Sequence, residues 1–423
     1  MEDRIKSNLL SIGGIVKAMK QKILWISPFV PYDKVNHAGG KNHNFYIKFF
    51  EKSGMYDIEL LTLCRKEEVG LIDLPAYGIP YHLEITDKSR VRVLWRKVLN
   101  LESKCNPFQR YGGGVRNNVI VLLRRLIRKY YEGNQNMHPE IVVLQWTQAA
   151  LLLPYVKKMF PNGRYVCIEE DVCFQSTERK VQSETNKWKK WFLRKRADKF
   201  KKCELNVLDM SDVVVTLNSK DTKLLTDEGI SKDKIFTSIV YFDSFHCKRQ
   251  ENFERNILFY GAMNRKENYM SVIWFIEKVM PLLENEKVTF VVVGGRPDKR
   301  LMRYQSNSVK IVGFVDDATS YFENATCFAA PLVLGAGIKV KILEALSAGI
   351  PVLTNDIGIE GIPARKGQDF MYCTTPQEYA DSIKLLLNNH DLAQNIGRNA
   401  KEFISSNYNL DEKLSELIQF INP

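Results

Sequence analysis

Short runs of apolar, often β-branched residues recur along this chain, separated by longer segments with helical character. Nearly every residue within a run is apolar, so the runs do not alternate between apolar and polar positions. Strands that are covered by helices on both faces have this composition, and they occur in parallel sheets. The sequence therefore predicts an α/β fold built on parallel sheets. The predicted strands are Ile23–Ser27, Ile58–Leu63, Ile141–Leu144, Tyr165–Ile168, Val213–Leu217, Ile257–Tyr260, Val288–Val293, Val309–Val312, Cys327–Ala330 and Val352–Thr354.

The strand pattern stops at a polar and charged segment, Asp243–Arg255, and then restarts. Beyond this segment the predicted strands recur every 18 to 31 residues, which is the spacing of βαβ units. We therefore predict two Rossmann-like domains, residues 1–248 and residues 249–409. A final helix, about Leu410–Ile421 within the segment 410–423, is expected to pack back on the first domain.

Two stretches of the first domain depart from this rhythm. Residues 1–18 precede the first predicted strand, and we expect them to be a leader of little structural weight or an artefact of the chosen start site. They contain no long apolar run before a small-residue cleavage site, so they do not resemble a secretory signal peptide. Residues 70–140 are less regular and predict an insertion or an irregular helical region.

The chain is basic, with 61 Lys and Arg against 49 Asp and Glu and a formal net charge of +12. This surplus suits nucleic acid, anionic lipid or phosphate-bearing substrates, and it selects none of them. No stretch reaches the roughly 18 consecutive apolar residues of a membrane-spanning helix. The eight cysteines are scattered without a C-x-x-C pair, so they predict no zinc site, and a reducing cytosol suits them better than secretion.

The segment Gly335–Thr354, GAGIKVKILEALSAGIPVLT, is the most informative part of the chain. It leads from a predicted strand through a glycine-containing loop into a helix that is expected to begin at about Ile338. Gly335 and Gly337 let the backbone approach a ligand closely. The helix N-terminus offers unpaired N–H groups and the positive end of the helix dipole.

Three residues of this segment have helical spacing. Gly337, Lys341 and Glu344 are four and three positions apart, so a helix would place them in one stripe. The stripe offers amides, an ammonium and a carboxylate in a row, which suits the phosphates and ribose hydroxyls of a nucleoside diphosphate. A surface helix with a Lys–Glu pair is the alternative.

This segment resembles the donor-site motif of retaining glycosyltransferases of the GT-B fold, family 4 type (glycosyl transferases group 1). The family form is E-x(7)-E followed by A-x-G-x-P-V-[VI], and this chain has SAGIPVL at Ser347–Leu353. Glu344 matches the second glutamate, which the resemblance assigns to the ribose hydroxyls of the donor. Ala336 stands at the place of the first glutamate, a usual contact of the donor sugar. The resemblance therefore implies that other groups recognise the sugar here.

The resemblance spans about residues 20–410 and implies two Rossmann-like domains that face an interdomain cleft, with the donor on the second domain. Cationic side chains after its first strand would meet the diphosphate, Arg265 as a bidentate clamp and Lys266 as a point charge. Backbone near Phe314 would bind the base. The predicted donor-binding residues are Gly261, Asn264, Lys266, Gly294, Phe314, Gly335, Gly337, Ile338 and Lys339, and Arg265, Lys341 and Glu344 are assigned catalytic roles. A solvated charged loop and ordinary tight turns are the alternatives for the residues outside the helix.

The first domain is expected to bind the acceptor. Gly39 and Gly40 precede a helix predicted near His43–Ser53, and their loop resembles the family's N-terminal glycine loop, which faces the donor phosphates and the acceptor. Glu170 and Asp171 follow a predicted strand at a point where relatives often carry a His-Asp pair. Carboxylates there can orient an acceptor hydroxyl or accept its proton, so both are predicted catalytic residues. A helix-capping acidic turn is the alternative.

Several absent motifs narrow the chemistry. The chain has no D-x-D pair, no H-x-x-x-H pair and six histidines, so we predict no metal ion and no cofactor beyond the nucleotide-sugar co-substrate. The charge of the leaving group is assigned to Arg265, Lys266, Lys339, Lys341 and the helix N-terminus. The absence of G-x-x-x-x-G-K-[ST] excludes a P-loop NTPase.

The segment Lys187–Lys202, KWKKWFLRKRADKFKK, contains nine basic residues, one acidic residue and four aromatic residues. In a helix, Trp188, Trp191 and Phe192 share one side. A basic aromatic helix of this kind can lie on an anionic membrane surface, and it can also hold nucleic acid. The alternative is an ordinary packing helix whose aromatic side chains enter the core.

Taken with these residues, the resemblance implies a retaining, metal-independent glycosyltransferase that moves a hexose from a nucleotide-sugar donor to a hydroxyl of a glycan or lipid-linked acceptor. We expect a role in cell-envelope or surface polysaccharide synthesis, a cytoplasmic location or one at the inner membrane face, and no nucleic-acid partner. Three alternatives stay open: a nucleotide-sugar 2-epimerase of the same fold, a non-catalytic nucleotide-sugar-binding relative, since Ala336 replaces a usual glutamate, and a basic nucleic-acid-binding protein.

Overall fold

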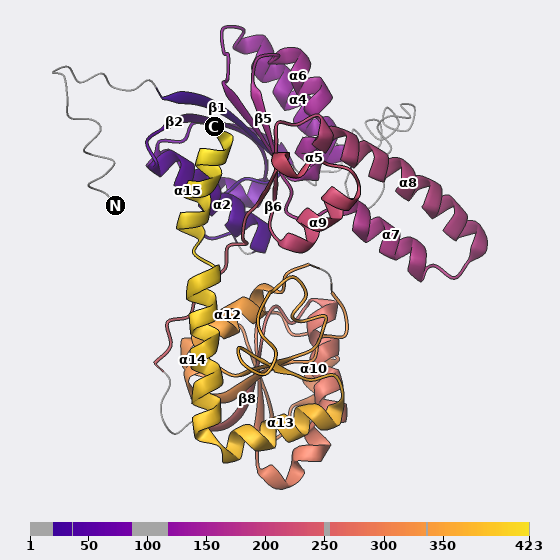
Figure 1. Cartoon of the computed structure of the whole chain (residues 1–423), viewed down its shortest axis with the longest axis vertical. Coiled ribbons are helices and arrows are strands. Elements are labelled where there is room, and N and C mark those ends of the chain that lie inside the picture. Colours follow the sequence, from indigo (N-terminus) through magenta and orange to yellow (C-terminus); the bar gives the residue numbers. More distant parts are fainter. Residues whose placement is uncertain (1–19, 36, 87–116, 249–253, 336, 423) are drawn as a thin grey trace, which may run out of the picture.

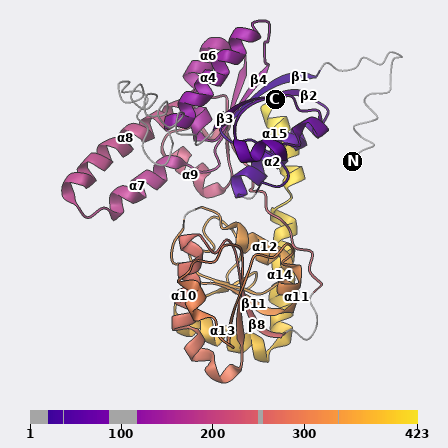
Figure 2. The ribbon, with the colours of Figure 1, turned by 180° about the vertical axis from the view of Figure 1, so that it is seen from behind.

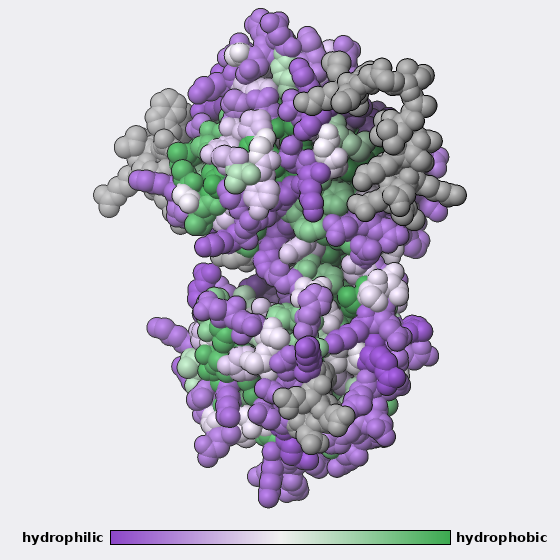
Figure 3. Space-filling view, turned by 90° about the vertical axis from the view of Figure 1, so that its left-hand side faces the viewer, coloured by the Kyte–Doolittle hydropathy of each residue, from purple (hydrophilic) through white to green (hydrophobic). Residues whose placement is uncertain are grey.

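The computed structural model describes residues 20–35, 37–86, 117–248, 254–335 and 337–422. The expected leader at 1–18, the middle of the irregular stretch 70–140, and Ala336 lie outside the described residues. Two bodies, each built on one parallel sheet, are stacked along the long axis of the molecule (Figure 1). The same stacking is seen from behind in Figure 2, and the outline narrows between the bodies in the space-filling view of Figure 3.

The first sheet has seven parallel strands in the order β3-β2-β1-β4-β5-β6-β7. This is the strand order of a doubly wound Rossmann-like sheet, whose direction of winding reverses between β1 and β4. The strands are β1 Gln21–Ser27, β2 Tyr56–Arg65, β3 Tyr81–Thr86, β4 Ile141–Gln145, β5 Arg164–Ile168, β6 Val213–Thr216 and β7 Ile235–Thr237.

Helices cover both faces of the first sheet. In β1 the side chains of Ile23 and Trp25 pack toward α2 and α15, whereas Leu24 and Ile26 pack toward α4, α6 and α8. Successive side chains of a strand point to opposite faces, so a strand with two covered faces is apolar throughout. The helices are α2 Ala38–Lys52, η1 Lys66–Leu71, η2 Leu74–Tyr77, α4 Asn117–Gly133, α5 Thr147–Ala150, α6 Leu153–Met159, α7 Cys173–Ser183, α8 Lys187–Asp209, α9 Ser219–Asp227, η4 Lys232–Lys234 and α15 Leu410–Ile421.

The second sheet has six parallel strands in the order β10-β9-β8-β11-β12-β13, which repeats the topology of the first sheet. Its strands are β8 Glu254–Tyr260, β9 Thr289–Val293, β10 Val309–Gly313, β11 Ala325–Ala330, β12 Val352–Thr354 and β13 Met371–Tyr372. Its helices are α10 Lys266–Lys278, η5 Met280–Glu286, η6 Leu301–Tyr304, α11 Thr319–Asn324, α12 Val340–Ala348, α13 Pro376–Asn388 and α14 His390–Asn407.

The chain returns to the first body at its C-terminal end. Helix α14 packs against α12 of the second body, and α15 continues beyond it to lie against α2 (Figure 1). Leu414 and Leu417 of α15 are fully buried in the same cluster as Trp25 and Phe50. The final helix therefore completes one covering layer of the first sheet.

All ten predicted strands are present, and the described residues contain three further strands that the sequence analysis missed. The missed strands β3, β7 and β13 pair with only one neighbour each, and β3 alternates between exposed and half-buried side chains. The alternating exposure of β3 leaves no uninterrupted apolar run, and β7 and β13 are only three and two residues long, so neither forms a recognisable run. The irregular region predicted for 70–140 is also partly wrong, because β3 and the 17-residue helix α4 are regular elements.

Two local predictions about helices are wrong. Helix α2 begins at Ala38 rather than near His43, so Gly39 and Gly40 lie in its first turn and not in a loop. Helix α12 begins at Val340, so Gly337 precedes it and does not share a helical stripe with Lys341 and Glu344. The alternative given for α8, a packing helix with its aromatic side chains in the core, holds for Phe200 but not for Trp188, Trp191 and Phe192, which are exposed.

Among the residues that the structure describes, no helix combines the length and the apolar character needed to cross a bilayer.

Candidate functional site

The predicted site residues lie on the segments that leave the carboxyl ends of the parallel strands, where ligands bind in open α/β sheets. A cavity of about 730 Å³ opens between the two bodies at these ends. The first body lines it with Gly39, Glu170 and Asp171, and the second body lines it with Arg265 and Ile338. The fold thus brings predicted acceptor-side and donor-side residues to one cavity.

Contacts across the cavity edge link the two bodies. Glu360, which follows β12, accepts hydrogen bonds from Arg179 of α7 at 3.3 Å and from Lys220 of α9. Lys339 forms an ion pair with the other oxygen of the same carboxylate at 3.4 Å. A β-carbon placed on Gly337 would lie 3.1 Å from Oδ1 of Asp171 in the first body. The loop before α12 therefore touches both the acceptor side and the charged contact between the bodies.

The lysines of the α12 segment are engaged with the chain itself. Lys339 donates to the carbonyl oxygen of Gly337, and burial lowers its pKa although Glu360 acts in the opposite direction. Lys341 donates to Oδ1 of Asn268 and lies 5.5 Å from the centroid of the Phe259 ring. Burial lowers the pKa of Lys341 to about 8. Neither lysine lines the cavity.

Glu344 is buried in α12 close to the segment that joins the two bodies. Burial, and then the charge of Asp243, raise its pKa to about 7, while Lys41 and Lys341 act in the opposite direction. Its side-chain carboxylate accepts no hydrogen bond from any residue that the structure describes. A buried carboxylate without a donor is costly, so a ligand with hydroxyl groups would complement it.

The start of α12 offers backbone donors. Lys339 is the N-cap residue, and its side chain does not cap the helix. The first N–H groups of a helix have no partner within the helix, and the helix dipole favours an anion beside them. The helix begins two residues later than expected, so these backbone donors belong to the residues from Val340 onward.

The β8 and β9 ends meet through two glycines. Gly294 has a φ of +150°, and a β-carbon there would lie 1.7 Å from the carbonyl oxygen of Gly261. Only glycine can stand at position 294, because the neighbouring atom is backbone and cannot move aside. The main chain after β8 therefore packs directly against the main chain after β9.

The charged loop after β8 is open to solvent. Arg265 is the N-cap residue of α10, has an ion pair with Glu267 at 2.6 Å, and lines the cavity. Asn264 and Lys266 are exposed. Phe314 is 75% exposed, so it is a rim residue and not a core residue. Of the four cations assigned to the leaving group, Arg265 is the one that lines the cavity.

In the first body, two neighbouring carboxyl groups that line the cavity have different environments. Glu170 accepts hydrogen bonds from Asn42 at 3.0 Å and from Gln145 at 2.7 Å, and burial raises its pKa to about 8. Asp171 has a pKa raised to about 6, first by burial and then by Asp221. At neutral pH the structure therefore favours a protonated Glu170 beside an ionised Asp171. Two carboxyl groups with different pKa values can act one as a proton donor and the other as a proton acceptor.

Sequence reasoning missed three aromatic residues of the cavity, Phe29, His37 and Trp146. Trp146 follows β4 with a φ of +67°, and its ring packs against Phe29 at 5.1 Å between centroids. Non-glycine residues in this conformation are uncommon and mark functional sites. Nδ1 of His37 accepts from the N–H of Gly40 at 3.0 Å, so the neutral ring carries its proton on Nε2. Burial lowers the pKa of His37, which favours that neutral form.

The residues that surround Glu170 are not marked by any local sequence pattern, because their positions depend on which strands are neighbours in the sheet. Asn42 and Gln145 meet Glu170 from positions far along the chain, and β4 lies beside β5 only in the folded sheet. The one available signal was position, since Trp146 stands directly after a predicted strand.

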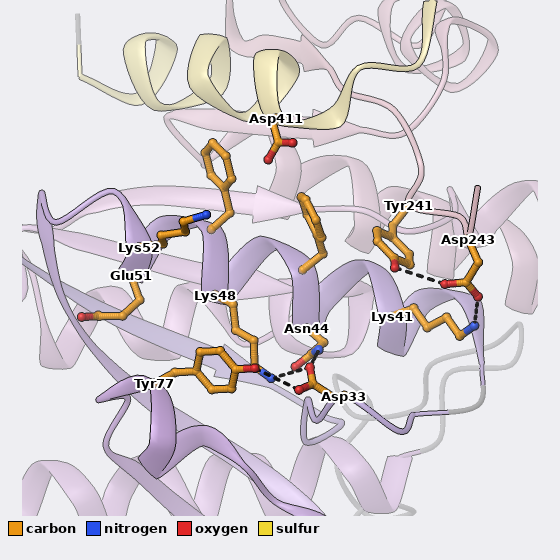
Figure 4. Close-up of a pocket in the computed structure, with 12 residues that line it drawn as sticks. Asp33, Lys41, Asn44, Lys48, Glu51, Lys52, Tyr77, Tyr241, Asp243 and Asp411 are labelled. Atoms are coloured by element: carbon orange, nitrogen blue, oxygen red, sulfur yellow. Dashed lines mark hydrogen bonds and ion pairs between the residues drawn. The ribbon is translucent and has the colours of Figure 1, made fainter. Parts of the chain in front are cut away.

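A second cavity, of about 540 Å³, lies on the outer face of α2 below α15 (Figure 4). Two of its lysines form ion pairs within it: Lys48 contacts Asp33 at 2.7 Å, and Lys41 contacts Asp243. None of the predicted site residues line it. The cavity between the bodies is therefore the candidate site.

Comparisons with known proteins agree with this geometry. Residues 254–389, which make up most of the second body, match the family model described as Glycosyl transferases group 1. A Klebsiella pneumoniae protein described as "Uncharacterized 44.6 kDa protein in cps region" is 25% identical over 189 residues, 42% of this chain and 47% of that protein. The chain thus aligns with about half the length of this curated relative.

Solved structures resemble the chain over nearly its whole length. Sucrose-phosphate synthase (tll1590) from Thermosynechococcus elongatus has a TM-score of 0.64 at 13% identity, with 95% of this chain and 98% of that chain covered. Anabaena Alr3699/HepE in complex with UDP has a TM-score of 0.63 at 12% identity, with 96% and 100% covered. TarM, from S. aureus, has a TM-score of 0.62 at 13% identity, with 97% and 100% covered. The chain has the GT-B fold.

Proposed function

We propose that this protein is a glycosyltransferase that moves a sugar from a nucleoside-diphosphate sugar to an acceptor hydroxyl. The observation that carries the proposal is the cavity between the carboxyl ends of the two sheets, where Arg265 and Ile338 face Glu170 and Asp171. The family match over 254–389 supports a transferase, and the HepE structures with UDP and with UDP-glucose support a nucleotide-sugar donor.

The donor is proposed to bind the second body. The unpartnered carboxylate of Glu344 would accept hydrogen bonds from the ribose hydroxyls, and charge-assisted bonds of this kind are the strong ones. Backbone N–H groups at the start of α12 and the guanidinium of Arg265 would hold the diphosphate. Lys339 would reach a phosphate only by leaving Glu360. The donor phosphate and the carboxylate of Glu360 would therefore compete for the same ammonium group.

The acceptor is proposed to bind the first body. Ionised Asp171 would orient the attacking hydroxyl, and Nε2–H of His37 and protonated Glu170 would donate hydrogen bonds around it. Closure of the two bodies would exclude water, which otherwise competes as the acceptor.

We propose transfer with retention and without a metal ion, as the family resemblance implies. In this scheme the bond between the anomeric carbon and the phosphate oxygen breaks, and the acceptor oxygen bonds to that carbon from the same face. The proton of the acceptor hydroxyl passes to the departing phosphate oxygen, so no enzymatic nucleophile is needed. The charge that develops on the phosphate would be met by Arg265 and by the N-terminus of α12.

We further propose a role in cell-envelope or surface polysaccharide synthesis on the cytoplasmic side of the membrane. The support is the cps-region description of the Klebsiella pneumoniae relative.

The proposal is tested in two steps. A panel of nucleotide sugars is screened by thermal shift, because a bound donor raises the melting temperature with the logarithm of its concentration over Kd. The donor that shifts the protein most is then incubated with and without glycan and lipid-linked acceptors, and the products are analysed by mass spectrometry and NMR. A new α- or β-glycoside that keeps the donor's configuration supports the proposal. A changed sugar without any acceptor would instead identify a 2-epimerase, and nucleotide binding without turnover would identify a non-catalytic relative.

A further inference from the structure

The helices α7 and α8 form an antiparallel pair that projects from the first body (Figures 1 and 2). The residues between them, 184–186, stand at the outer end of the pair. Trp188, Trp191 and Phe192 follow directly at the start of α8 and are 85%, 55% and 56% exposed. Trp188 is the most exposed large apolar side chain in the described part of the chain.

The aromatic residues occupy the face of α8 that does not pack. Trp188, Trp191 and Phe192 are three and four positions apart, so they lie on one side of the helix. The buried residues Ala197, Phe200 and Glu204 follow the same spacing on the opposite side, toward α7 and the sheet. The aromatic side chains therefore contribute little to the fold, and large apolar groups displayed together indicate an interaction surface.

Positive charge surrounds the aromatic stripe. The segment Lys187–Lys202 carries nine basic residues and one acidic residue. Lys189 is paired with Glu184, and Lys201 is paired with Glu178 and Glu228. Arg194 and Arg196 form no ion pair with the described residues. The side chain of Lys195 lies over the ring of Trp191, 4.2 Å from its centroid. The outer end of α8 thus combines an apolar stripe with unneutralised cations on its flanks.

We propose that the outer end of α8 docks on an anionic lipid bilayer. Trp188, Trp191 and Phe192 enter the headgroup region, and the flanking cations lie at the lipid phosphates. A projecting helix end presents its aromatic rings outward, whereas single-stranded nucleic acid is held in a charged groove, so the shape favours a bilayer. The proposal goes beyond the proposed function, because none of the catalytic roles above needs this surface.

The location of the surface relates it to the candidate site. Helix α7 begins two residues after Asp171 and spans 11 residues to the outer end of the pair, which is about 16 Å of helix. A bilayer bound there would lie beside the acceptor side of the cavity, within reach of an acceptor that is anchored in lipid.

The test is co-sedimentation of the full chain with vesicles of phosphatidylcholine, with or without phosphatidylglycerol. The wild-type chain is expected to sediment with the anionic vesicles and to be released by high salt. The triple variant Trp188→Ser, Trp191→Ser, Phe192→Ser is expected to lose at least about tenfold in apparent affinity. A matched triple variant, Leu282→Ser, Met302→Ser, Leu385→Ser, removes three exposed apolar side chains of the second body and is expected to bind as the wild type does. Circular dichroism verifies that both variants are folded.

A charge variant separates the two contributions. Arg194→Glu with Arg196→Glu is expected to abolish the preference for phosphatidylglycerol while the aromatic residues remain.

The proposal is overturned if the wild-type chain stays in the supernatant with anionic vesicles, or if the aromatic variant binds as tightly as the wild type. It is also overturned if sedimentation velocity shows that these aromatic residues hold a dimer together, or if single-stranded nucleic acid competes away vesicle binding in an aromatic-dependent way. Vesicle binding needs no turnover, so these results are independent of the glycosyltransferase proposal.

Discussion

Oδ1 of Asp171 in the first body lies 3.1 Å from the position that a β-carbon on Gly337 would occupy in the second body. Gly337 also has a φ of +69°, in the left-handed region that side chains disfavour. The loop that leads into α12 therefore approaches the acceptor-side carboxylate closely because residue 337 has no side chain.

Gly337→Ala is expected to lower kcat/KM by about tenfold or more. The added methyl group would push the loop away from Asp171 and so displace the bound donor sugar relative to the acceptor hydroxyl. The melting temperature should change little, since the backbone strain amounts to about 1 kcal/mol. Gly367→Ala is the control, because Gly367 has a φ of +75° and nothing within 4 Å of an added β-carbon. Equal loss of activity in both variants would show that strain alone is responsible and that the contact with Asp171 has no role.

Glu344→Gln is expected to weaken nucleotide-sugar binding by at least about tenfold, since hydrogen bonds to a charged group contribute about 1.5–3 kcal/mol. Because the pKa of Glu344 is about 7, donor affinity of the wild type should rise as pH increases through 7 and the carboxylate forms. The affinity of the Gln variant should be flat over the same range. Isothermal titration calorimetry from pH 6 to pH 8 checks both statements. A wild-type affinity that falls with rising pH would contradict the assignment of the ionised form.

Glu170 makes stability depend on pH. Its pKa in the folded protein, about 8, lies above the ordinary value of 4.5, so the native state holds this proton more tightly than the unfolded state. The stabilisation of the folded protein by this proton is complete below pH 4.5 and is lost as pH rises toward 8. The Glu170→Gln variant has no carboxyl group to ionise at this position. Its free energy of unfolding, relative to that of the wild type, should therefore rise by on the order of 3 kcal/mol between pH 5 and pH 8.

Urea unfolding at pH 5, 6.5 and 8 measures this difference. The exposed Glu402 gives the control variant Glu402→Gln, whose stability relative to the wild type should stay nearly constant. A difference between Glu170→Gln and the wild type that shrinks as pH rises would show that the folded protein favours the ionised carboxylate instead.

Glu360 is expected to hold the two bodies together in the absence of a bound nucleotide sugar, because it binds Arg179 and Lys220 of the first body and Lys339, which directly precedes α12. Glu360→Gln removes the negative charge that the three cations share. Small-angle scattering should then give a larger radius of gyration for the donor-free variant than for the wild type. The variant Asp298→Asn removes an ion pair within the second body, with Arg300, and should leave the radius unchanged. An unchanged radius in the Glu360 variant would show that other contacts keep the bodies together.

Local composition predicted most of the framework. Each of the ten apolar runs is a strand, because a strand covered on both faces has no position for a polar residue, as Ile23 to Ile26 show. Strand β3 escaped notice because its side chains alternate in exposure, and β7 and β13 escaped notice because three and two residues are too few to form a recognisable run. The extent of α2 was missed because two glycines at Gly39 and Gly40 indicate a loop, whereas His37 caps a helix that includes them.

The candidate site was predictable in part for a geometric reason. Loops at the carboxyl ends of parallel strands converge, so Glu170, Asp171 and Arg265 could be expected at one cavity before their distances were known. Their partners could not be expected, since Asn42 and Gln145 reach Glu170 only through the order of the strands.

The amino-acid sequence by itself determined the kind of fold, the strand positions and the residue types at the strand ends, because burial and backbone freedom restrict residues locally. Tertiary structure alone decided which charges face one another and which faces stay exposed. Lys339 meets Glu360, Lys341 meets Asn268, and Trp188 points to solvent, since pairing and burial depend on residues that are distant in the chain.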